Sequence, residues 1–282
     1  MIKTVCVIGA GTMGAGIALA IAQKDYPVLL CDINEAVISG AKDGIKKNLL
    51  FLLEREKINE QQKERIWQNI QFTSSIQDCK ADLVIEAIVE KIEIKAKLLN
   101  QVAALNTPET ILASNTSSLS ITSIQKELPH PERVAGLHFF NPAHIMKLVE
   151  VVKGEYTDDA VANGLLDFCM QIDKVPVLCK DAPGFIVNRV ARHYYLEAMS
   201  LVENNLATLE DVDAAMEAAG FKMGPFKLMD LIGMDVNLAV STSLYEAFDK
   251  EERFRPSKLQ TEKVQQNNLG RKTGRGFYNY KA

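Results

Sequence analysis

The stretch that decides the fold reads VCVIGAGTMG and covers residues 5–14. Its first four residues are apolar and mostly β-branched, which is typical of a strand buried on both faces of a parallel sheet. Three glycines in the pattern G-x-G-x-x-G follow, and a helical pattern of small and apolar residues comes next. A second strand pattern, Val28–Cys31, then ends at Asp32. This order predicts a strand, a glycine-rich turn, a helix and a parallel strand.

The glycine-rich turn predicts a dinucleotide site, although the glycine pattern alone also fits an ordinary strand-to-helix turn. Between a strand and a helix, glycines let the backbone approach a pyrophosphate, whose charge then lies at the positive helix end. Asp32, about 20 residues further on, can accept hydrogen bonds from the ribose hydroxyls. A carboxylate there repels a 2′-phosphate, so we expect NAD rather than NADP. The expected cofactor residues of this unit are Gly9, Ala10, Gly11, Thr12, Met13, Gly14 and Asp32.

The charged segment that follows, Glu35–Gln68, has helical spacing and is long for a crossover connection. Its leucines, Leu49, Leu50, Leu52 and Leu53, suggest one apolar face on a basic helix pair. We therefore expect an inserted helical hairpin.

The rest of the chain predicts an α/β domain and then a helical one. Strand-like runs alternate at first with helical segments such as Glu93–Ala104, and they stop near Pro183. This pattern is typical of a Rossmann-type, mostly parallel sheet followed by an all-α domain, which we place at residues 1–183 and 184–282. The strand-like runs are Leu83–Ile85, Ile111–Ala113, Val134–His138, Leu148–Val152 and Val175–Cys179, and the late helical runs are Val187–Glu203, Leu209–Ala219 and Met229–Phe248.

Composition argues against several classes of partner. The net charge of -4 provides no global positive field for nucleic acid. The longest apolar run, Ala15–Ala22, is far shorter than the ~20 residues of a membrane-spanning helix. The five cysteines are odd in number and form no C-x-x-C pair, which favours reduced thiols over a disulfide framework or a zinc site. Because the chain starts without a signal or transit pattern, we expect a cytoplasmic protein.

Polar side chains follow two of the predicted strands. Residues 114–118, Ser-Asn-Thr-Ser-Ser, come after one strand, at the edge where α/β sheets bind ligands. His138 stands at the end of another strand, and Glu150 lies within an apolar strand pattern. A buried carboxylate needs a partner, so a His138–Glu150 pair would form a general base. The alternative is a backbone-capped His138 with Glu150 pointing to water.

Six motifs, spread over the whole chain, resemble one family. They are GAGTMGAGIA (9–18), SNTSSLSIT (114–122), GLHFFNPAHIMKLVEVV (136–152), KDAPGFIVNR (180–189), MGPF (223–226) and LGRKTGRGFYNY (269–280). Together they are similar to the short-chain L-3-hydroxyacyl-CoA dehydrogenases, which include bacterial 3-hydroxybutyryl-CoA dehydrogenases. The resemblance implies hydride transfer between NAD and C3 of a short (S)-3-hydroxyacyl-CoA or 3-oxoacyl-CoA. It further implies an acyl-CoA substrate, no metal, a homodimer, and a place in fatty acid or butyrate metabolism.

The resemblance also implies site residues. His138 would be catalytic with Glu150 as its partner, and Ser117 and Asn188 would surround the oxygen of the substrate. The implied cofactor contacts are Asp32, Glu90, Lys95, Asn115, Ser117, Asn141 and Lys272, and the implied coenzyme A contacts are Asn48 and Arg55, where the family usually carries Ser and Lys.

Some of these residues have plainer interpretations. Glu90 and Lys95 also fit a solvated helix face, and Lys272 also fits a charge on a surface turn. One position departs from the family pattern, because His144 stands where relatives commonly carry proline.

Two other functions remain open. One is a dehydrogenase of a free hydroxy acid, such as the sugar-acid dehydrogenases related to lens crystallins; the run HFFNP at 138–142 and the basic hairpin argue against it. The other is a dinucleotide-binding protein without turnover, because a fold alone does not establish a function. The presence of His138, Glu150, Ser117 and Asn188 argues against that second function.

Overall fold

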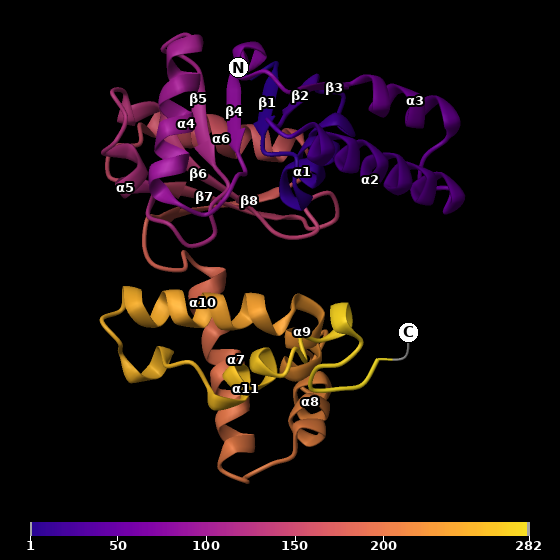
Figure 1. Ribbon diagram of the computed structural model, residues 1–282, viewed down its shortest axis with the longest axis vertical. Helices are drawn as coiled ribbons and strands as arrows, with labels where there is room; N and C mark the ends of the chain where they lie inside the picture. Colours follow the sequence, from indigo (N-terminus) through magenta and orange to yellow (C-terminus); the bar gives the residue numbers. More distant parts are fainter. Residues whose placement is uncertain (1, 281–282) are drawn as a thin grey trace. The chain divides into compact units, whose positions relative to one another are not determined.

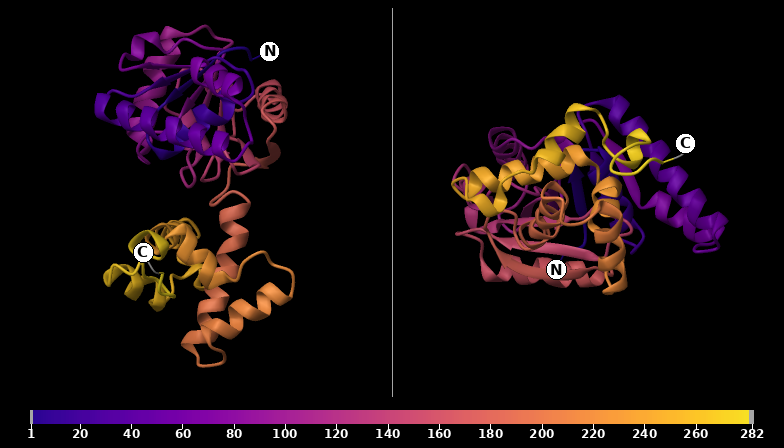
Figure 2. Two further views of the ribbon diagram at one scale, coloured as in Figure 1. Left: turned by 90° about the vertical axis from the view of Figure 1, so that its right-hand side faces the viewer. Right: turned by 90° about the horizontal axis from the view of Figure 1, so that it is seen from below.

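The computed structural model describes residues 2–280, which divide into two compact units. The first unit ends at Ala182 and the second begins at Pro183, one residue before the boundary expected from sequence (Figures 1 and 2). Within residues 2–280, no helix combines the length and the apolar character needed to cross a membrane.

The first unit is built on an eight-stranded sheet with the strand order β3-β2-β1-β4-β5-β6-β7-β8. All neighbouring strands are parallel except β6 and β7, which are antiparallel. The predicted Rossmann-type, mostly parallel sheet is therefore confirmed. The strands are β1 (Val5–Ile8), β2 (Val28–Cys31), β3 (Ile70–Thr73), β4 (Leu83–Glu86), β5 (Ile111–Ser114), β6 (Val134–Phe139), β7 (Leu148–Lys153) and β8 (Val175–Lys180). The sequence did not indicate β3, whose four residues include only one that is fully buried.

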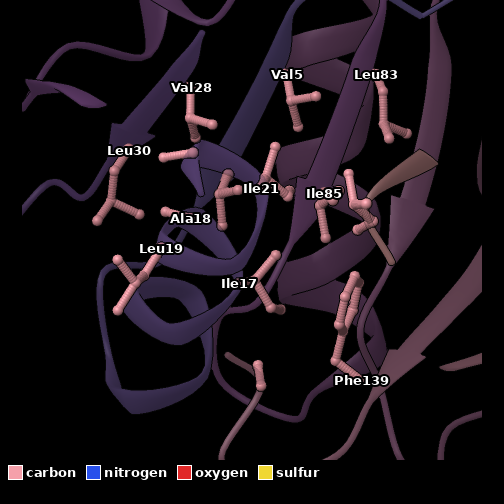
Figure 3. Packing of buried hydrophobic residues seen from close by; sticks show 14 of the residues in the cluster. Val5, Ile17, Ala18, Leu19, Ile21, Val28, Leu30, Leu83, Ile85 and Phe139 are labelled. Carbon is pink, nitrogen blue, oxygen red and sulfur yellow. The ribbon is translucent and has the colours of Figure 1, made fainter. Parts of the chain in front are cut away.

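Alternate residues of the central strands point to opposite faces of the sheet, and helices bury both faces. Val5 lies in one cluster with Ile17 of α1 (Thr12–Ala22), as Figure 3 shows, and Val7 belongs to the same cluster. Cys6 lies in another cluster, with Leu99 of α4 (Ile92–Leu105). Burying an aliphatic side chain of this size contributes roughly 1.5–3 kcal/mol. The helices of this unit are α1 (Thr12–Ala22), α2 (Glu35–Glu54), α3 (Glu60–Gln68), α4 (Ile92–Leu105), α5 (Ile121–Gln125) and α6 (Asp159–Gln171).

Helices α2 and α3 form the expected hairpin, which adjoins the β3 edge of the sheet (Figure 1). Asn34 caps α2, and Asn59 begins α3 with a capping box. The expected apolar face was wrong in detail, because Leu49 is buried but Leu50 is 49% exposed. Successive helical residues are about 100° apart, so the buried side follows the three- and four-residue spacing of Ile38, Ala41, Ile45 and Leu49.

Residues 183–280 form a helical unit. Its α-helices are α7 (Val187–Glu203), α8 (Leu209–Ala218), α9 (Pro225–Ile232), α10 (Met234–Ala247) and α11 (Lys258–Gln265). The expectation of one helix over Met229–Phe248 is wrong, because Gly233 separates α9 from α10. Its φ of 104° lies in a region that favours glycine, and this one residue is both the C-cap of α9 and the N-cap of α10. Met199, Phe226 and Met229 form the core of this unit.

Candidate active site

The glycine-rich turn has two glycines that the fold requires and one that it does not. Gly9 has a φ of 101°, and a Cβ there would lie 2.5 Å from the carbonyl oxygen of Ala87. A Cβ at Gly14 would lie 1.7 Å from the Gly9 carbonyl oxygen. At Gly11, by contrast, a Cβ would meet no described atom within 4 Å. The open space at Gly11, which is the N-cap of α1, fits the close approach of a pyrophosphate to the backbone.

Asp32 is held beside this turn. Its Oδ2 accepts a hydrogen bond from the Ala10 N–H at 2.9 Å, and its Oδ1 accepts one from the Asn34 N–H at 2.9 Å. The carboxylate therefore lies at the end of β2, next to the start of α1. This is the place that an adenosine ribose would need, so the residues present fit NAD.

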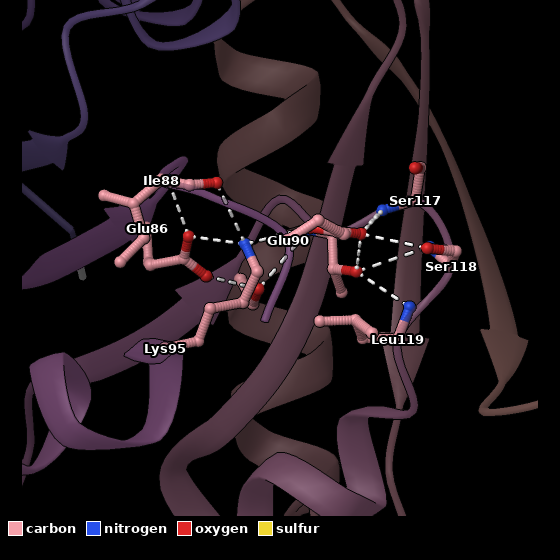
Figure 4. Close-up of polar contacts among 9 residues, drawn as sticks. Glu86, Ile88, Glu90, Lys95, Ser117, Ser118 and Leu119 are labelled. Carbon is pink, nitrogen blue, oxygen red and sulfur yellow. Dashed lines mark hydrogen bonds and ion pairs between the residues drawn. The ribbon is translucent and has the colours of Figure 1, made fainter. Parts of the chain in front are cut away.

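A buried carboxylate, Glu86, ends β4 and is a site residue that the sequence analysis missed (Figure 4). It accepts hydrogen bonds from Lys95 Nζ at 2.6 Å, from Ser114 Oγ at 2.6 Å and from the Ile88 N–H at 2.7 Å. Lys95 is 1% exposed, so the alternative of a solvated helix face is wrong for this lysine. The sequence did contain a signal for Glu86, because it is a charged residue at the end of an apolar strand pattern, at the edge of the sheet where ligands bind.

Glu90 connects this ion pair to the serine-rich loop (Figure 4). Its Oε2 lies 3.1 Å from Lys95 Nζ, and its Oε1 accepts hydrogen bonds from the Ser117 N–H at 3.1 Å, from Ser118 Oγ at 3.1 Å and from the Thr116 hydroxyl. Burial alone would raise the pKa of Glu90, but the charge of Lys95 and the bonds from the loop lower it below its ordinary value. Glu90 is therefore ionised at neutral pH and fixes the loop that carries Ser117.

Asn115 joins this loop to the neighbouring strand. Its N–H donates to the Glu86 carbonyl oxygen at 2.8 Å, and its side-chain Oδ1 accepts from the Phe139 N–H at 2.9 Å. The ends of β4, β5 and β6 are thereby held together. The serine-rich loop is thus fixed at the strand end that carries His138.

His138 and Glu150 are register partners in the antiparallel pair β6–β7. His138 Nδ1 lies 2.8 Å from Glu150 Oε2, and the residues are 6% and 1% exposed. The alternative in which Glu150 points to water is therefore wrong. Partners directly opposite each other in an antiparallel pair have their side chains on the same face, so the register itself forms this contact.

The connection between β6 and β7 carries Asn141 and His144. A buried lysine, Lys174, holds it by donating from Nζ to the carbonyl oxygens of Ala143 at 2.7 Å and Met146 at 2.8 Å. Burial lowers the pKa of Lys174 to about 8, and repulsion from Lys147 adds to the shift. Burial and the charge of Lys174 also lower the pKa of His144. The burial of Lys174 was not predicted from the sequence.

Of the expected coenzyme A residues, Asn48 lies on α2 and Arg55 is the C-cap of that helix. Asn48 Nδ2 donates to the Gly44 carbonyl oxygen at 2.9 Å, and the Arg55 guanidinium lies 5.3 Å from the centroid of the Phe51 ring. Other hairpin cations also cover aromatic rings, with Lys46 Nζ 4.9 Å from the Trp67 centroid. Between α2 and α3 there is a pocket lined by Lys46, Leu49, Leu50, Lys63, Glu64 and Trp67.

Two expected site residues belong to the helical unit. Asn188 is the second residue of α7 and is partly buried. Lys272 lies on a short turn, and its Nζ is 2.6 Å from Asp235 Oδ2 at the start of α10. Its charge is therefore held by an ion pair. The cofactor and substrate roles of these residues stay predictions.

Comparison with known proteins finds the same family that the sequence motifs resemble. The family description "3-hydroxyacyl-CoA dehydrogenase, NAD binding domain" matches residues 4–182, and "3-hydroxyacyl-CoA dehydrogenase, C-terminal domain" matches residues 184–280. The 3-hydroxyadipyl-CoA dehydrogenase of Escherichia coli is 48% identical over 100% of this chain, which spans 60% of that longer protein. The mitochondrial hydroxyacyl-coenzyme A dehydrogenase of Mus musculus is 42% identical, with 100% of this chain and 92% of that protein covered.

A solved structure shows the same architecture. The (S)-3-hydroxybutyryl-CoA dehydrogenase of Ralstonia eutropha superimposes with a TM-score of 0.94 at 38% identity, with 100% of both chains covered. These matches confirm the resemblance found in the motifs and the NAD-binding character of the first unit. The chain belongs to the 3-hydroxyacyl-CoA dehydrogenase family.

Proposed function

We propose that this chain catalyses the reversible, NAD-dependent oxidation of the C3 hydroxyl of short-chain (S)-3-hydroxyacyl-CoA thioesters. The buried His138–Glu150 pair carries the proposal, because it places an oriented imidazole at the ligand-binding edge of an NAD-type sheet. The names of relatives support the short chain, including a probable 3-hydroxybutyryl-CoA dehydrogenase of Deinococcus radiodurans at 39% identity.

His138 would act as the base in oxidation and as the acid in reduction. With Nδ1 directed at Glu150, Nε2 would take the hydroxyl proton while NAD supplies the hydride acceptor. The Glu150 carboxylate would stabilise the positive ring that forms and keep it in one orientation. In the reverse direction the charged ring would polarise the C3 ketone and return the proton.

Ser117 and Asn188 would hydrogen-bond the reacting oxygen. The Glu90 carboxylate fixes the backbone at Ser117, so this residue is supported by a chain of bonds back to buried Glu86. Because Ser117 is already held in place, less conformational entropy is lost when the transition state forms. Asn141 and Lys272 would add contacts to the cofactor.

The hairpin would hold coenzyme A. Its cations include Lys42, Lys46 and Arg55, and they would attract the adenosine phosphates of the thioester in a protein whose net charge is -4. Asn48 would add a hydrogen bond from the same helix.

We also propose a cytoplasmic homodimer as the working form. Five free cysteines suit a reducing compartment. The helical unit exposes large apolar side chains, including Leu206 at 73%, Phe221 at 50% and Leu231 at 49%, which would suit a contact with a second copy.

One assay separates the candidate functions. NADH oxidation is measured with acetoacetyl-CoA, with free acetoacetate and without substrate, and we expect turnover with the thioester alone. Equal turnover of free acetoacetate would favour a hydroxy-acid dehydrogenase. NADH binding without any turnover would favour the non-catalytic alternative.

A further inference from the structure

The helical unit contains a buried arginine whose described hydrogen bonds all go to neutral groups. Arg192 of α7 is 2% exposed, and its Nη1 donates to the Asn237 carbonyl oxygen at 3.0 Å, to Asn237 Oδ1 at 3.0 Å and to Ser241 Oγ at 2.8 Å. Gln260 completes the group by donating to Asn237 Oδ1 at 2.6 Å and to Ser241 Oγ at 2.9 Å. All of these acceptors are neutral.

The Nε atom of this guanidinium has no acceptor among the described residues. Among residues 2–280, Nε of Arg192 is buried without a hydrogen bond, and no carboxylate forms an ion pair with this side chain. A buried cation without a counter-ion is unfavourable, because neutral hydrogen bonds replace only part of its hydration. Burial accordingly lowers the pKa of Arg192 to about 10. The neutral bonds and the Tyr195 ring, whose centroid lies 5.3 Å from Cζ, orient the guanidinium, but no carboxylate among residues 2–280 forms an ion pair with it.

The position of Arg192 suggests what could compensate this charge. Arg192 follows Asn188 by one helical turn of α7, and residues four apart lie on the same helix face with Cβ atoms about 5–6 Å apart. In the proposed function, Asn188 contacts the oxygen on C3 of the acyl chain. A group a few carbons beyond C3 would therefore come within reach of the long Arg192 side chain.

We propose that Arg192 recognises a carboxylate at the far end of the acyl chain, so that the preferred substrates are CoA thioesters of 3-hydroxy dicarboxylic acids. This inference rests on the proposed function. A carboxylate would accept the Nε–H and neutralise the buried charge, and the planar guanidinium matches carboxylate geometry better than an ammonium does. A chain that ends in a methyl group would leave the charge uncompensated.

The test compares two six-carbon thioesters in NADH oxidation, the 3-oxo thioester that ends in a carboxylate and the 3-oxo thioester that ends in a methyl group. We expect the wild-type protein to prefer the carboxylate by about 10- to 100-fold in kcat/KM. Arg192→Met should remove this preference while changing kcat/KM for the methyl-ended thioester only a few-fold, and Arg192→Lys should retain part of it. Arg253→Met is the matched control, because Arg253 is an exposed arginine of the same unit that pairs with Glu251.

The outcomes are distinguishable. No preference in the wild-type protein, or equal losses on both thioesters in a folded Arg192→Met variant, would show that Arg192 only ties α7 to α10 and α11, and would overturn the inference. If Arg192→Met does not fold, the inference is tested by the wild-type preference for the carboxylate and by the part of that preference that Arg192→Lys retains. Turnover of acetoacetyl-CoA without a preference for the carboxylate overturns this inference alone, whereas no turnover of any thioester overturns the proposed function as well.

Discussion

His138 Nδ1 lies 2.8 Å from Glu150 Oε2, and the two residues face each other across the one antiparallel neighbour pair of the described sheet. If β7 paired with β6 in a register shifted by one residue, the Glu150 side chain would point to the opposite face of the sheet from His138. The local change of strand direction and its register therefore create the contact on which the proposed chemistry depends.

The roles of this pair can be separated by kinetics. His138→Ala should lower kcat by about 10²- to 10⁴-fold with little change in NADH binding, because it removes the proton acceptor but no cofactor contact. Glu150→Gln should lower kcat less, because it keeps the shape but removes the charge that stabilises the imidazolium. Stopped-flow turnover and NADH fluorescence titration measure the two effects. Unchanged rates in Glu150→Gln would exclude Glu150 from the mechanism.

The same pair predicts opposite pH limits for the two directions. Oxidation needs a neutral imidazole and should fail on the acid side, whereas reduction needs a charged imidazolium and should fail on the alkaline side. Initial rates in both directions across one set of buffers test this. Parallel pH profiles for the two directions would contradict the assignment of His138.

The sequence predicted those parts of the fold where local pattern and burial agree. Strand β1 is buried on both faces, so its four residues read as one apolar run, and the glycines after it mark a turn that only glycine can make at Gly9 and Gly14. Gly233 was missed because the apolar pattern continues past it and a helical glycine costs only about 1 kcal/mol. Its φ of 104° depends on tertiary structure.

The site was predicted less completely than the fold. Charged residues are usually exposed, so the sequence around Lys95 also fitted a solvated helix face. For the same reason, Glu86 and Lys174 were not predicted to be buried. Their burial depends on partners that are distant in sequence, such as Ser114 for Glu86 and Ala143 for Lys174. The motifs implied a set of site residues whose roles stay predictions, whereas the bonds that support those residues could be found only in the structure.

The Glu86–Lys95 pair predicts a large loss of stability when only one partner is removed. Lys95→Met should lower the free energy of unfolding by about 3–5 kcal/mol, because it leaves the Glu86 carboxylate buried without a cation. The double variant Glu86→Gln with Lys95→Met should be less destabilised than the sum of the two single variants. Urea unfolding measures this, with Lys97→Met, an exposed lysine of the same helix, as the control. Additive losses would contradict the coupling.

Asp32 should control the choice of cofactor. Asp32→Ser combined with Ile33→Arg should weaken NADH and improve NADPH, because it replaces a repelling carboxylate with a cation; Ile33 is 86% exposed and tolerates the longer side chain. The double variant also loses the bond to the Ala10 N–H, so some loss of total activity is expected. The ratio of kcat/KM for the two cofactors is the readout, and Ile33→Arg alone is the control. A wild-type preference for NADPH would contradict the role of Asp32.

The hairpin should bind the phosphates of coenzyme A. Arg55→Ala should raise KM for acetoacetyl-CoA more than KM for the pantetheine thioester, which lacks the adenosine phosphates, and added salt should reduce the difference because the Debye length shortens. Arg65→Ala is the control, because Arg65 lies on the same hairpin but pairs with Asp25. Equal changes with both thioesters would show that these cations serve only solubility.

Lys174 should give the folded protein a stability that rises with pH. Its pKa is lowered to about 8, chiefly by burial and further by repulsion from Lys147, whereas an unfolded lysine titrates near 10.5. Between these values the unfolded chain binds more protons than the folded one, so the unfolding free energy rises with pH across this window, on the order of 3 kcal/mol in total. Below about pH 8 both states are protonated and the penalty of the buried charge is constant.

The measurement is urea unfolding of wild type and Lys174→Met between pH 7 and pH 10. Other titrating groups affect both proteins alike, so the difference between their unfolding free energies isolates the contribution of Lys174. As the pH rises, the unfolding free energy of the wild type should increase relative to that of Lys174→Met. Lys147→Met removes a repelling charge and should shift the start of the window to higher pH. Curves that stay parallel over the whole range would mean that Lys174 titrates in its native site as it does in the unfolded chain.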